Sequence, residues 1–333
     1  MILSSDGDPV APKTTRRPFD EILTLACRAP SVHNTQPWLW RLRGDELELW
    51  ADLSRQVLQM DPDGRDLALS CGAALHHVQV AARGLGWRAE VTRLPDPRNH
   101  RRLASITLEP VIKPQEAIDE MMAISSRQTD RRRFTSWPVP PERLDTLARI
   151  GEQWGAAVVP ITDESARARL RTLTRRADEA QSGDPAYQAE LAAHLNDRSD
   201  GMSIHAVPIE PDEGNRTFPT GTLEDQTRPP VGDPEGILVI CTEDDSVLCR
   251  LRAGEAMSAI WLRATMDGFR VVPLSQALEV EETRQAVQGQ LLEGRGFPQI
   301  ILRVGWPPIA DTEPLPASRR RPLDDVLIRE PAR

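Results

Sequence analysis

The segment Arg28–Trp38 concentrates polar side chains between two rigid prolines. Pro30 and Pro37 bias the residues before them away from the helical region, so the donors and acceptors stand on a fixed, irregular backbone. An ordinary polar turn is the alternative interpretation, but the pattern Pro-Ser-x-x-Asn-x-Gln-Pro-Trp is long and specific. We therefore expect this segment to contact a ligand through Arg28, Ser31, Asn34 and Gln36.

A second segment, Ser126–Phe134, carries arginines at alternate positions. In an extended backbone such arginines can clamp a phosphate, because the planar guanidinium matches two phosphate oxygens at once. Most arginine runs are solvated surface, but the embedded hydroxyl of Thr129 and the closing phenylalanine favour a phosphate site. The candidates in this segment are Arg127, Thr129 and Arg131.

Two shorter segments complete the set of candidates. Val272–Gln276 lies just after a glycine that ends a predicted helix, and Ser318–Pro322 near the C-terminus contains three successive arginines. A basic tail can serve solubility, or it can supply cations to an anionic ligand. The candidates in these two segments are Leu274, Ser275, Gln276, Arg320 and Arg321.

Two similar helix-to-strand units must position these segments. Gly72–Val91 and Gly254–Pro273 each place one glycine fourteen residues before a second glycine, and each then turns into an alternating stretch. The pattern predicts two long buried helices, each ended by glycine and followed by a strand. An offset of 182 residues relates the two copies. Their common order favours duplication over chance similarity.

Hydrophobic periodicity predicts a mixed α and β chain. We expect helices over Phe19–Ala26, Arg65–Arg83, Pro114–Ser125, Pro141–Glu152, Glu164–Ala180 and Ser246–Met266. We expect strands over Trp38–Arg43, Glu46–Asp52, Leu103–Leu108, Ala156–Ile161, Gly236–Cys241 and Gln299–Val304. Residues at about 197–234 break this rhythm, and long excursions without an apolar period are usually functional or disordered. We interpret this stretch as a candidate lid.

Composition excludes several classes of protein. The net charge of -9 over 333 residues argues against nonspecific binding of nucleic acid, which needs clustered cations. No apolar run reaches the length of about 18 residues that a membrane span needs, and the N-terminus lacks a secretory pattern. The 4 cysteines have no CxxC spacing, and adjacent His76 and His77 cannot easily reach one metal ion. We expect a cytoplasmic protein with no metal, membrane or nucleic-acid partner.

Two of these motifs resemble the nitroreductase superfamily of FMN flavoproteins. One is the Pro-Ser-x-x-Asn-x-Gln-Pro-Trp loop, and the other is the Ser126–Phe134 run, which resembles an RxSxRxF element with Thr129 in place of serine. The resemblance implies that Arg127 and Thr129 hold the ribityl phosphate and that Arg131 reaches the N1 and O2 edge of the flavin. It also implies a backbone N–H to flavin N5 from the turn at Ser275, flanked by Leu274 and Gln276. This turn departs from the common Glu-Gly pair of the superfamily. Arg320 and Arg321 would add cations to the phosphate.

The distribution of the motifs resembles the Acg-type subgroup of single chains with a twin nitroreductase fold. The first half supplies the polar loop, and the second half supplies the arginine clamp, the turn and the basic tail. The resemblance implies an α+β nitroreductase-like fold of two fused repeats, 15–122 and 123–330, with the lid-like insertion at about 197–234 in the second. The repeats would form an intramolecular pseudodimer, with helices around antiparallel or mixed sheets, and one FMN per chain. The chain would be a monomeric pseudodimer or a homodimer.

Three functions remain open at this point. As an oxidoreductase, the protein would pass hydride from NAD(P)H to FMN and then electrons to a small acceptor such as a nitroaromatic or quinone, with no catalytic side chains beyond the cofactor. As a storage protein, it would cover FMN with the lid and resist reduction by NAD(P)H. As a relic of the fold, it would hold no flavin.

Overall fold

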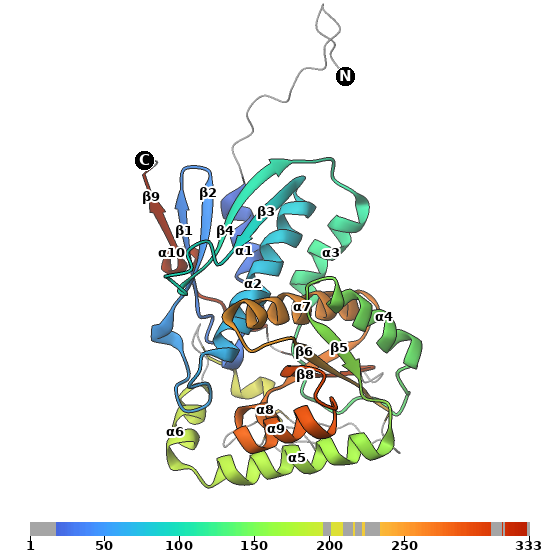
Figure 1. Cartoon of the computed structure of the whole chain (residues 1–333). Helices are drawn as coiled ribbons and strands as arrows, with labels where there is room; N and C mark the ends of the chain where they lie inside the picture. The colour runs from blue at the N-terminus through green and yellow to red at the C-terminus, as the bar shows by residue number, and fades with distance from the viewer. Residues whose placement is uncertain are drawn as a thin grey trace, which may run out of the picture.

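The computed structural model describes residues 18–195, 201–208, 216, 222–223, 234–307, 315 and 317–331. Two sheets lie on opposite sides of two long helices that cross each other (Figure 1). The first sheet has the order β3-β4-β2-β1-β9 and is mixed, because β9 runs parallel to β1 while the other pairs are antiparallel. Its strands are β1 (Trp38–Arg43), β2 (Glu46–Ala51), β3 (Trp87–Arg93), β4 (Arg102–Pro110) and β9 (Leu327–Glu330).

The second sheet has the order β5-β6-β8-β7 and is antiparallel throughout. All seven residues of β6 are buried, as the unbroken apolar run Ile-Leu-Val-Ile-Cys requires. Helices α5, α8 and α9 cover one face of this sheet (Figure 1). The strands are β5 (Ala157–Pro160), β6 (Gly236–Thr242), β7 (Arg270–Leu274) and β8 (Phe297–Gly305).

The helices follow the predicted ranges closely. The helices are α1 (Phe19–Ala26), α2 (Arg65–Gly84), α3 (Gln115–Ser126), α4 (Pro141–Glu152), α5 (Glu164–Ser182), α6 (Pro185–Ala193), α7 (Val247–Met266), α8 (Gln276–Glu279), α9 (Glu281–Gln290) and α10 (Leu323–Val326). Side-chain caps start several of them: the Ser246 hydroxyl accepts a hydrogen bond from Cys249 N at 3.3 Å at the start of α7. The mixed α+β class expected from the sequence is confirmed.

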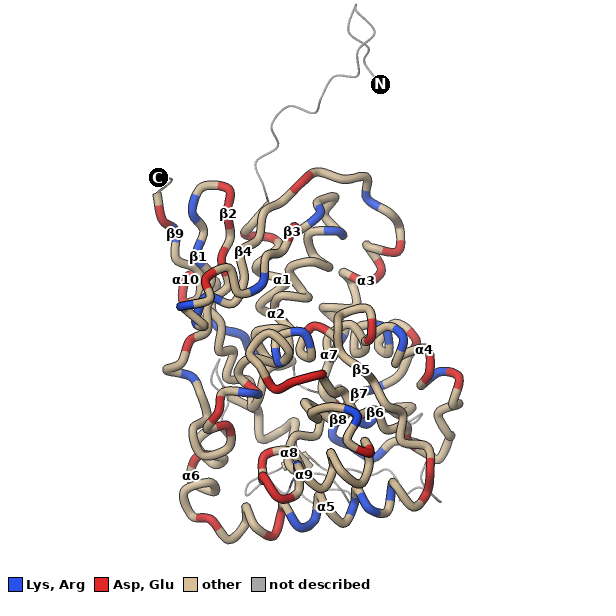
Figure 2. Tube along the Cα trace, viewed as in Figure 1, with Lys and Arg blue, Asp and Glu red and all other residues tan. Residues whose placement is uncertain are grey.

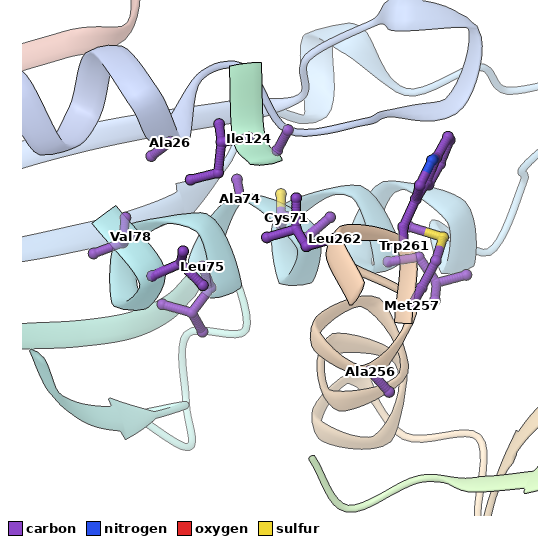
Figure 3. Close-up of a cluster of buried hydrophobic side chains, with 14 of the residues drawn as sticks. Ala26, Cys71, Ala74, Leu75, Val78, Ile124, Ala256, Met257, Trp261 and Leu262 are labelled. Carbon is purple, nitrogen blue, oxygen red and sulfur yellow. The ribbon is translucent and has the colours of Figure 1, made fainter. Parts of the chain in front are cut away.

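Helices α2 and α7 cross in the middle of the main core, and their glycines touch. A Cβ atom added at Gly72 would lie 2.1 Å from the carbonyl oxygen of Leu251, and one added at Gly254 would lie 2.1 Å from that of Leu69. The two contacts are reciprocal, because 182 residues separate Gly72 from Gly254 and also Leu69 from Leu251. The same offset separates His76 from Ser258, whose Nδ1 and Oγ atoms lie 2.9 Å apart. Figure 3 draws the apolar side chains at this crossing, including Cys71 of α2 and Leu262 of α7. Reciprocal contacts of this kind have the form of a contact across a twofold axis.

Alanine at Gly72 is expected to destabilise the protein by about 1–3 kcal/mol, because the added methyl group meets backbone that cannot rotate away. Urea denaturation would measure the loss. The matched control is Gly289→Ala in α9, where no atom lies within 4 Å of the added Cβ. That change is expected to raise stability by up to about 1 kcal/mol, because alanine favours the helix. Equal effects at the two sites would contradict the close approach of α2 and α7.

Three features differ from the sequence expectations. β9 was not predicted; it comes from the range assigned to the second repeat, yet it pairs with β1 in the first sheet. The short helices α6, α8, α9 and α10 were not predicted either, because four to ten residues carry too little periodicity. Much of the candidate lid at 197–234 lies outside the described residues, which include 201–208, 216 and 222–223 of it.

Charged residues of both signs are interspersed along the surface helices, as α5 illustrates (Figure 2). Within the described ranges, no helix is long and apolar enough to cross a membrane.

Candidate functional site

A cavity of about 470 Å³ lies where segments from both halves of the chain meet. The first half contributes the loop after α1 and the first turns of α2. The second half contributes residues 127–131, one face of α7, the turn between β7 and α8, and the segment before α10. Described residues of the candidate lid also line it, namely Gly201, Met202, Ser203, His205, Ala206, Pro208 and Arg216.

The loop of the first half has an unusual backbone. His33, Asn34 and Gln36 have positive φ angles of 44°, 58° and 51°, a region that side-chain-bearing residues adopt at a cost. Hydrogen bonds hold this conformation: Ser31 Oγ accepts from Gln36 N at 3.0 Å, and Asn34 Nδ2 donates to Gly201 O at 2.8 Å. Such a loop presents its polar groups in one arrangement.

Three arginines lie close together beside the cavity, and two of them, Arg127 and Arg320, line it. The Arg127 guanidinium is buried, lies 4.6 Å from the centre of the Trp261 ring and donates to Arg28 O at 3.1 Å. Arg320 donates to the same carbonyl at 3.1 Å and to Asn34 Oδ1 at 2.9 Å. Among the residues that the structure describes, no carboxylate pairs with Arg28, Arg127 or Arg320, and the Nε atoms of the last two have no hydrogen-bond partner.

In this arginine cluster (Arg28, Arg127 and Arg320), the pKa values of two guanidinium groups are lowered. Burial first, and then the neighbouring Arg320 and Arg28, lower the pKa of Arg127 to about 9. Burial and Arg28 likewise lower the pKa of Arg320 to about 10. Arg127 is buried and Arg320 is half-buried beside the exposed Arg28, and no carboxylate among the described residues offsets their charge, so the cluster is suited to an anionic ligand with several oxygens.

The turn after β7 also lines the cavity. Ser275 Oγ donates to Glu279 Oε1 at 2.6 Å, and the buried Glu279 also accepts from Gln181 and Tyr187 and pairs with Arg216. The amide of Gln276 donates to Asp178 on α5 at 2.9 Å. These bonds tie the turn to α5, α6 and the lid segment, so its backbone is fixed.

Most of the predicted residues meet at this cavity. It is lined by Ser31, Asn34, Arg127, Thr129, Arg131, Leu274, Ser275, Gln276 and Arg320. Arg28, Gln36 and Arg321 do not line it. Arg28 supplies the carbonyl described above, and Gln36 is fully buried, where its Oε1 accepts from Arg321 N at 2.9 Å. The Arg321 guanidinium bonds to Gln36 O and lies 3.7 Å from Asp52, so it supports the loop rather than the cavity.

Several lining residues were missed from the sequence. Met257 and Trp261 lie one turn apart on α7, a spacing that predicts only a core-facing stripe. Asp66 and Ser70 lie one turn apart at the start of α2, where polar residues are commonplace. His33 lies inside the polar loop and Arg216 inside the candidate lid, but neither residue was itself singled out as a candidate.

The positions related to this cavity by the 182-residue offset hold a different structure. Arg93 corresponds to Ser275, and Gln79 corresponds to Trp261. Here Arg93 donates twice to the fully buried Glu255, both at 2.7 Å, and Gln79 donates to the same carboxylate at 2.8 Å. This buried acid cluster (Gln79, Arg93 and Glu255) fills the corresponding place with packed side chains.

The chain matches no model of a known protein family. It is 38% identical over 337 residues to a Mycobacterium tuberculosis protein named "Putative NAD(P)H nitroreductase Rv3131", which covers 98% of this chain and 97% of the relative. It is 33% identical over 312 residues to the protein of the same organism named for the same activity with the symbol acg, which covers 91% and 93%.

Solved structures with similar arrangements include nitroreductases. One from Bacteroides fragilis with bound FMN is 11% identical, covers 59% of this chain and 91% of that chain, and has a TM-score of 0.39. One from Anabaena variabilis is 10% identical, covers 79% and 69%, and has a TM-score of 0.47.

Proposed function

Because this chain belongs to the family of NAD(P)H nitroreductase-like proteins that includes Acg, we propose that it is an FMN-dependent oxidoreductase with one flavin in the cavity between its halves. NAD(P)H would be the reductant, and a small nitroaromatic or quinone would be the acceptor. FMN supplies the two-electron chemistry, while the polypeptide binds the ring, orients it and controls access.

The arginine cluster is the observation that carries this proposal. Arg127 and Arg320 have buried Nε–H groups without a partner among the described residues, and a phosphate oxygen is the strong acceptor that such groups lack. The residues present therefore fit the phosphate end of FMN. Thr129, which forms a β-bridge with Val271 of β7, would add a hydroxyl donor to the phosphate.

The rest of the cavity fits a flat polar ring. Trp261, Met257 and Leu274 offer apolar surface, and the fixed turn at Ser275 offers a backbone N–H for flavin N5. Arg131 lines the same space and would place a cation near the N1 and O2 edge, where reduction leaves negative charge. Ser31 and Asn34 would contact the ring from the other half of the chain.

The twin-repeat organisation, with repeats 15–122 and 123–330, is part of the same proposal. The reciprocal glycine contacts of α2 and α7 support it, and the buried acid cluster supports a single flavin per chain, since Arg93, Gln79 and Glu255 occupy the related position. Internal pairing of this kind would let the chain act as a monomer, although it also permits a homodimer.

Storage of FMN is the second candidate function, and one observation favours it. The described lid residues contact the cavity directly: Asn34 bonds to Gly201 O, and the Arg131 guanidinium lies 3.4 Å from Met202 Sδ. A segment seated in this way can cover a bound ring and keep nicotinamide away from it.

Two measurements on the purified protein separate these functions. Reconstitution with FMN is expected to saturate at one flavin per chain, because only one of the two related positions is open. Anaerobic mixing with NADH or NADPH is then expected to bleach the oxidised-flavin absorbance. Unchanged colour would favour storage, two flavins per chain would contradict the single site, and a colourless protein that binds no added FMN would contradict both functions.

A further inference from the structure

Asp66 in the first turn of α2 is a buried acid that the proposed flavin site does not use. Its side chain lines the cavity and is 4% exposed. Oδ1 accepts from Arg65 Nε at 3.1 Å, whereas Oδ2 is buried without a hydrogen-bond partner among the described residues. An unpartnered carboxylate oxygen is costly, but a protonated carboxyl has a donor to offer instead.

Two carboxyl groups share one cation at this place. Asp61 is also 4% exposed, and its Oδ2 accepts from the backbone N–H of Leu67 at 2.9 Å. Arg65 is the guanidinium between them, and it also donates to Leu278 O. The other charged groups facing this trio (Asp61, Arg65 and Asp66) are Glu279 and Arg216, which pair with each other. The trio therefore approaches neutrality only if its two carboxyl groups retain one proton.

The burial of Asp61 and Asp66 also favours a retained proton. It raises the pKa of Asp61 to about 7, with the neighbouring Asp66 adding to the effect, and it raises the pKa of Asp66 as well. The trio thus holds a proton that can leave near neutral pH. A group that retains a proton under working conditions and can release it is suited to general acid catalysis.

The position of the trio relates it to the reacting end of the site. Asp66 and Ser275 line the same cavity, and Glu279 and Arg216, which bind Ser275, also influence Asp66 electrostatically. Asp66 therefore lies on the side where the flavin N5 atom is expected under the proposed function.

We propose that Asp66 is the catalytic acid that protonates the acceptor; this inference rests on the proposed function. A quinone that accepts a hydride must also gain one proton. The nicotinamide would supply the hydride, and the carboxyl of Asp66 supplies the proton. Together they convert the two carbonyl oxygens of the quinone into the two hydroxyls of the hydroquinone, and Asp66 is left as a carboxylate paired with Arg65. Asp66 regains a proton from water, with Asp61 sharing it.

The first test uses the flavin-free protein and measures protonation directly. Infrared difference spectra are expected to show the C=O stretch of a protonated carboxyl that titrates near pH 7 in the wild type. Asp66→Asn keeps the shape and an oxygen for Arg65 but removes the neighbouring carboxyl that adds to the raised pKa of Asp61, so the band should titrate at a lower pH than in the wild type. If Asp66→Asn fails to fold, Asp61→Asn is expected to remove the same band. A band absent from the wild type, or unchanged in both variants, would overturn the inference.

The second test uses the FMN-bound protein and measures flavin reduction and flavin reoxidation separately. After chemical reduction, the flavin of Asp66→Asn is expected to be reoxidised by benzoquinone about 100-fold more slowly than that of the wild type. Reduction by NAD(P)H should change little, because hydride transfer to the flavin needs no acid. Asp63→Asn, an exposed change two residues beyond Asp61, is the matched control and should leave both rates unchanged. Equal reoxidation rates in wild type and Asp66→Asn would refute the role of Asp66 and leave the proposed function standing. A wild type that holds no FMN would refute both.

Discussion

Replacing Arg127 by methionine is expected to weaken FMN binding while stabilising the flavin-free protein. The loss of a charged hydrogen bond to the phosphate is worth about 1.5–3 kcal/mol, or about 10- to 150-fold in Kd. The flavin-free protein should gain about 1–4 kcal/mol, because methionine keeps the packing on Trp261 and removes a buried cation that has no carboxylate partner among the described residues. Fluorescence titration with FMN and thermal melts with and without flavin measure the two effects.

The gain in stability should depend on pH in a defined direction. The pKa of Arg127 in the folded protein, about 9, lies below its ordinary value, so the folded state binds this proton more weakly than the unfolded chain does. Charged Arg127 destabilises the folded state fully below pH 9, and this destabilisation is lost as the pH rises above 9. The difference in melting temperature between variant and wild type should therefore shrink from pH 7 to pH 10.

Arg143→Met, an exposed change on α4, is the matched control and should alter neither property. A variant at Arg127 that melts at a lower temperature and binds FMN with wild-type affinity would contradict the assignment of the arginine cluster to the phosphate.

Replacing Arg93 by methionine is expected to cost about 3–5 kcal/mol of stability, since it leaves the fully buried Glu255 without its cation. Burial already raises the pKa of Glu255, and the arginine opposes that rise. A carboxyl with a raised folded pKa destabilises the folded state above that pKa and is relieved as the pH falls through it. The loss should therefore be larger at pH 8 than at pH 5, as chemical denaturation at both values would measure.

The control for this experiment lies in the same strand. Arg88 pairs with Glu90 and Glu109 at the surface, so Arg88→Met should change stability by less than about 0.5 kcal/mol. The double variant Arg93→Met with Glu255→Met should recover much of the loss, because a buried ion pair can be replaced by apolar groups of similar size. A loss in Arg93→Met that is the same at both pH values would show that Glu255 is not left as a buried charge.

The sequence predicts the central helices and most of the cavity lining well, because both depend on local patterns. The repeated glycine spacing identifies α2 and α7, and the proline-bounded loop and alternating arginines identify the two sides of the cavity. These signals lie within about twenty consecutive residues, where periodicity and turn chemistry are informative.

The features that the sequence does not predict all depend on contacts between distant residues. β9 is a strand of four residues whose partner lies near the start of the chain. Glu255 resembles an ordinary polar position of a helix until Arg93, 162 residues away, is placed against it. Asp66 resembles a surface residue in a first helical turn, yet it is 4% exposed in the structure, where the neighbouring Arg65 donates to Leu278 O of α8 and Ser70 Oγ accepts from Val32 N of the loop after α1. Local patterns contain no record of these partners.

The pairing of β9 with β1 has a consequence for biosynthesis. The segment that ends in β9 first lines the cavity at Ser318, Arg319 and Arg320 and then becomes an edge strand of the N-terminal sheet. β1 is translated long before this segment. The N-terminal sheet therefore lacks an edge strand, and the cavity lacks Arg320, until translation has passed Glu330, so the arginine cluster can bind an anion only once both halves of the chain have been made.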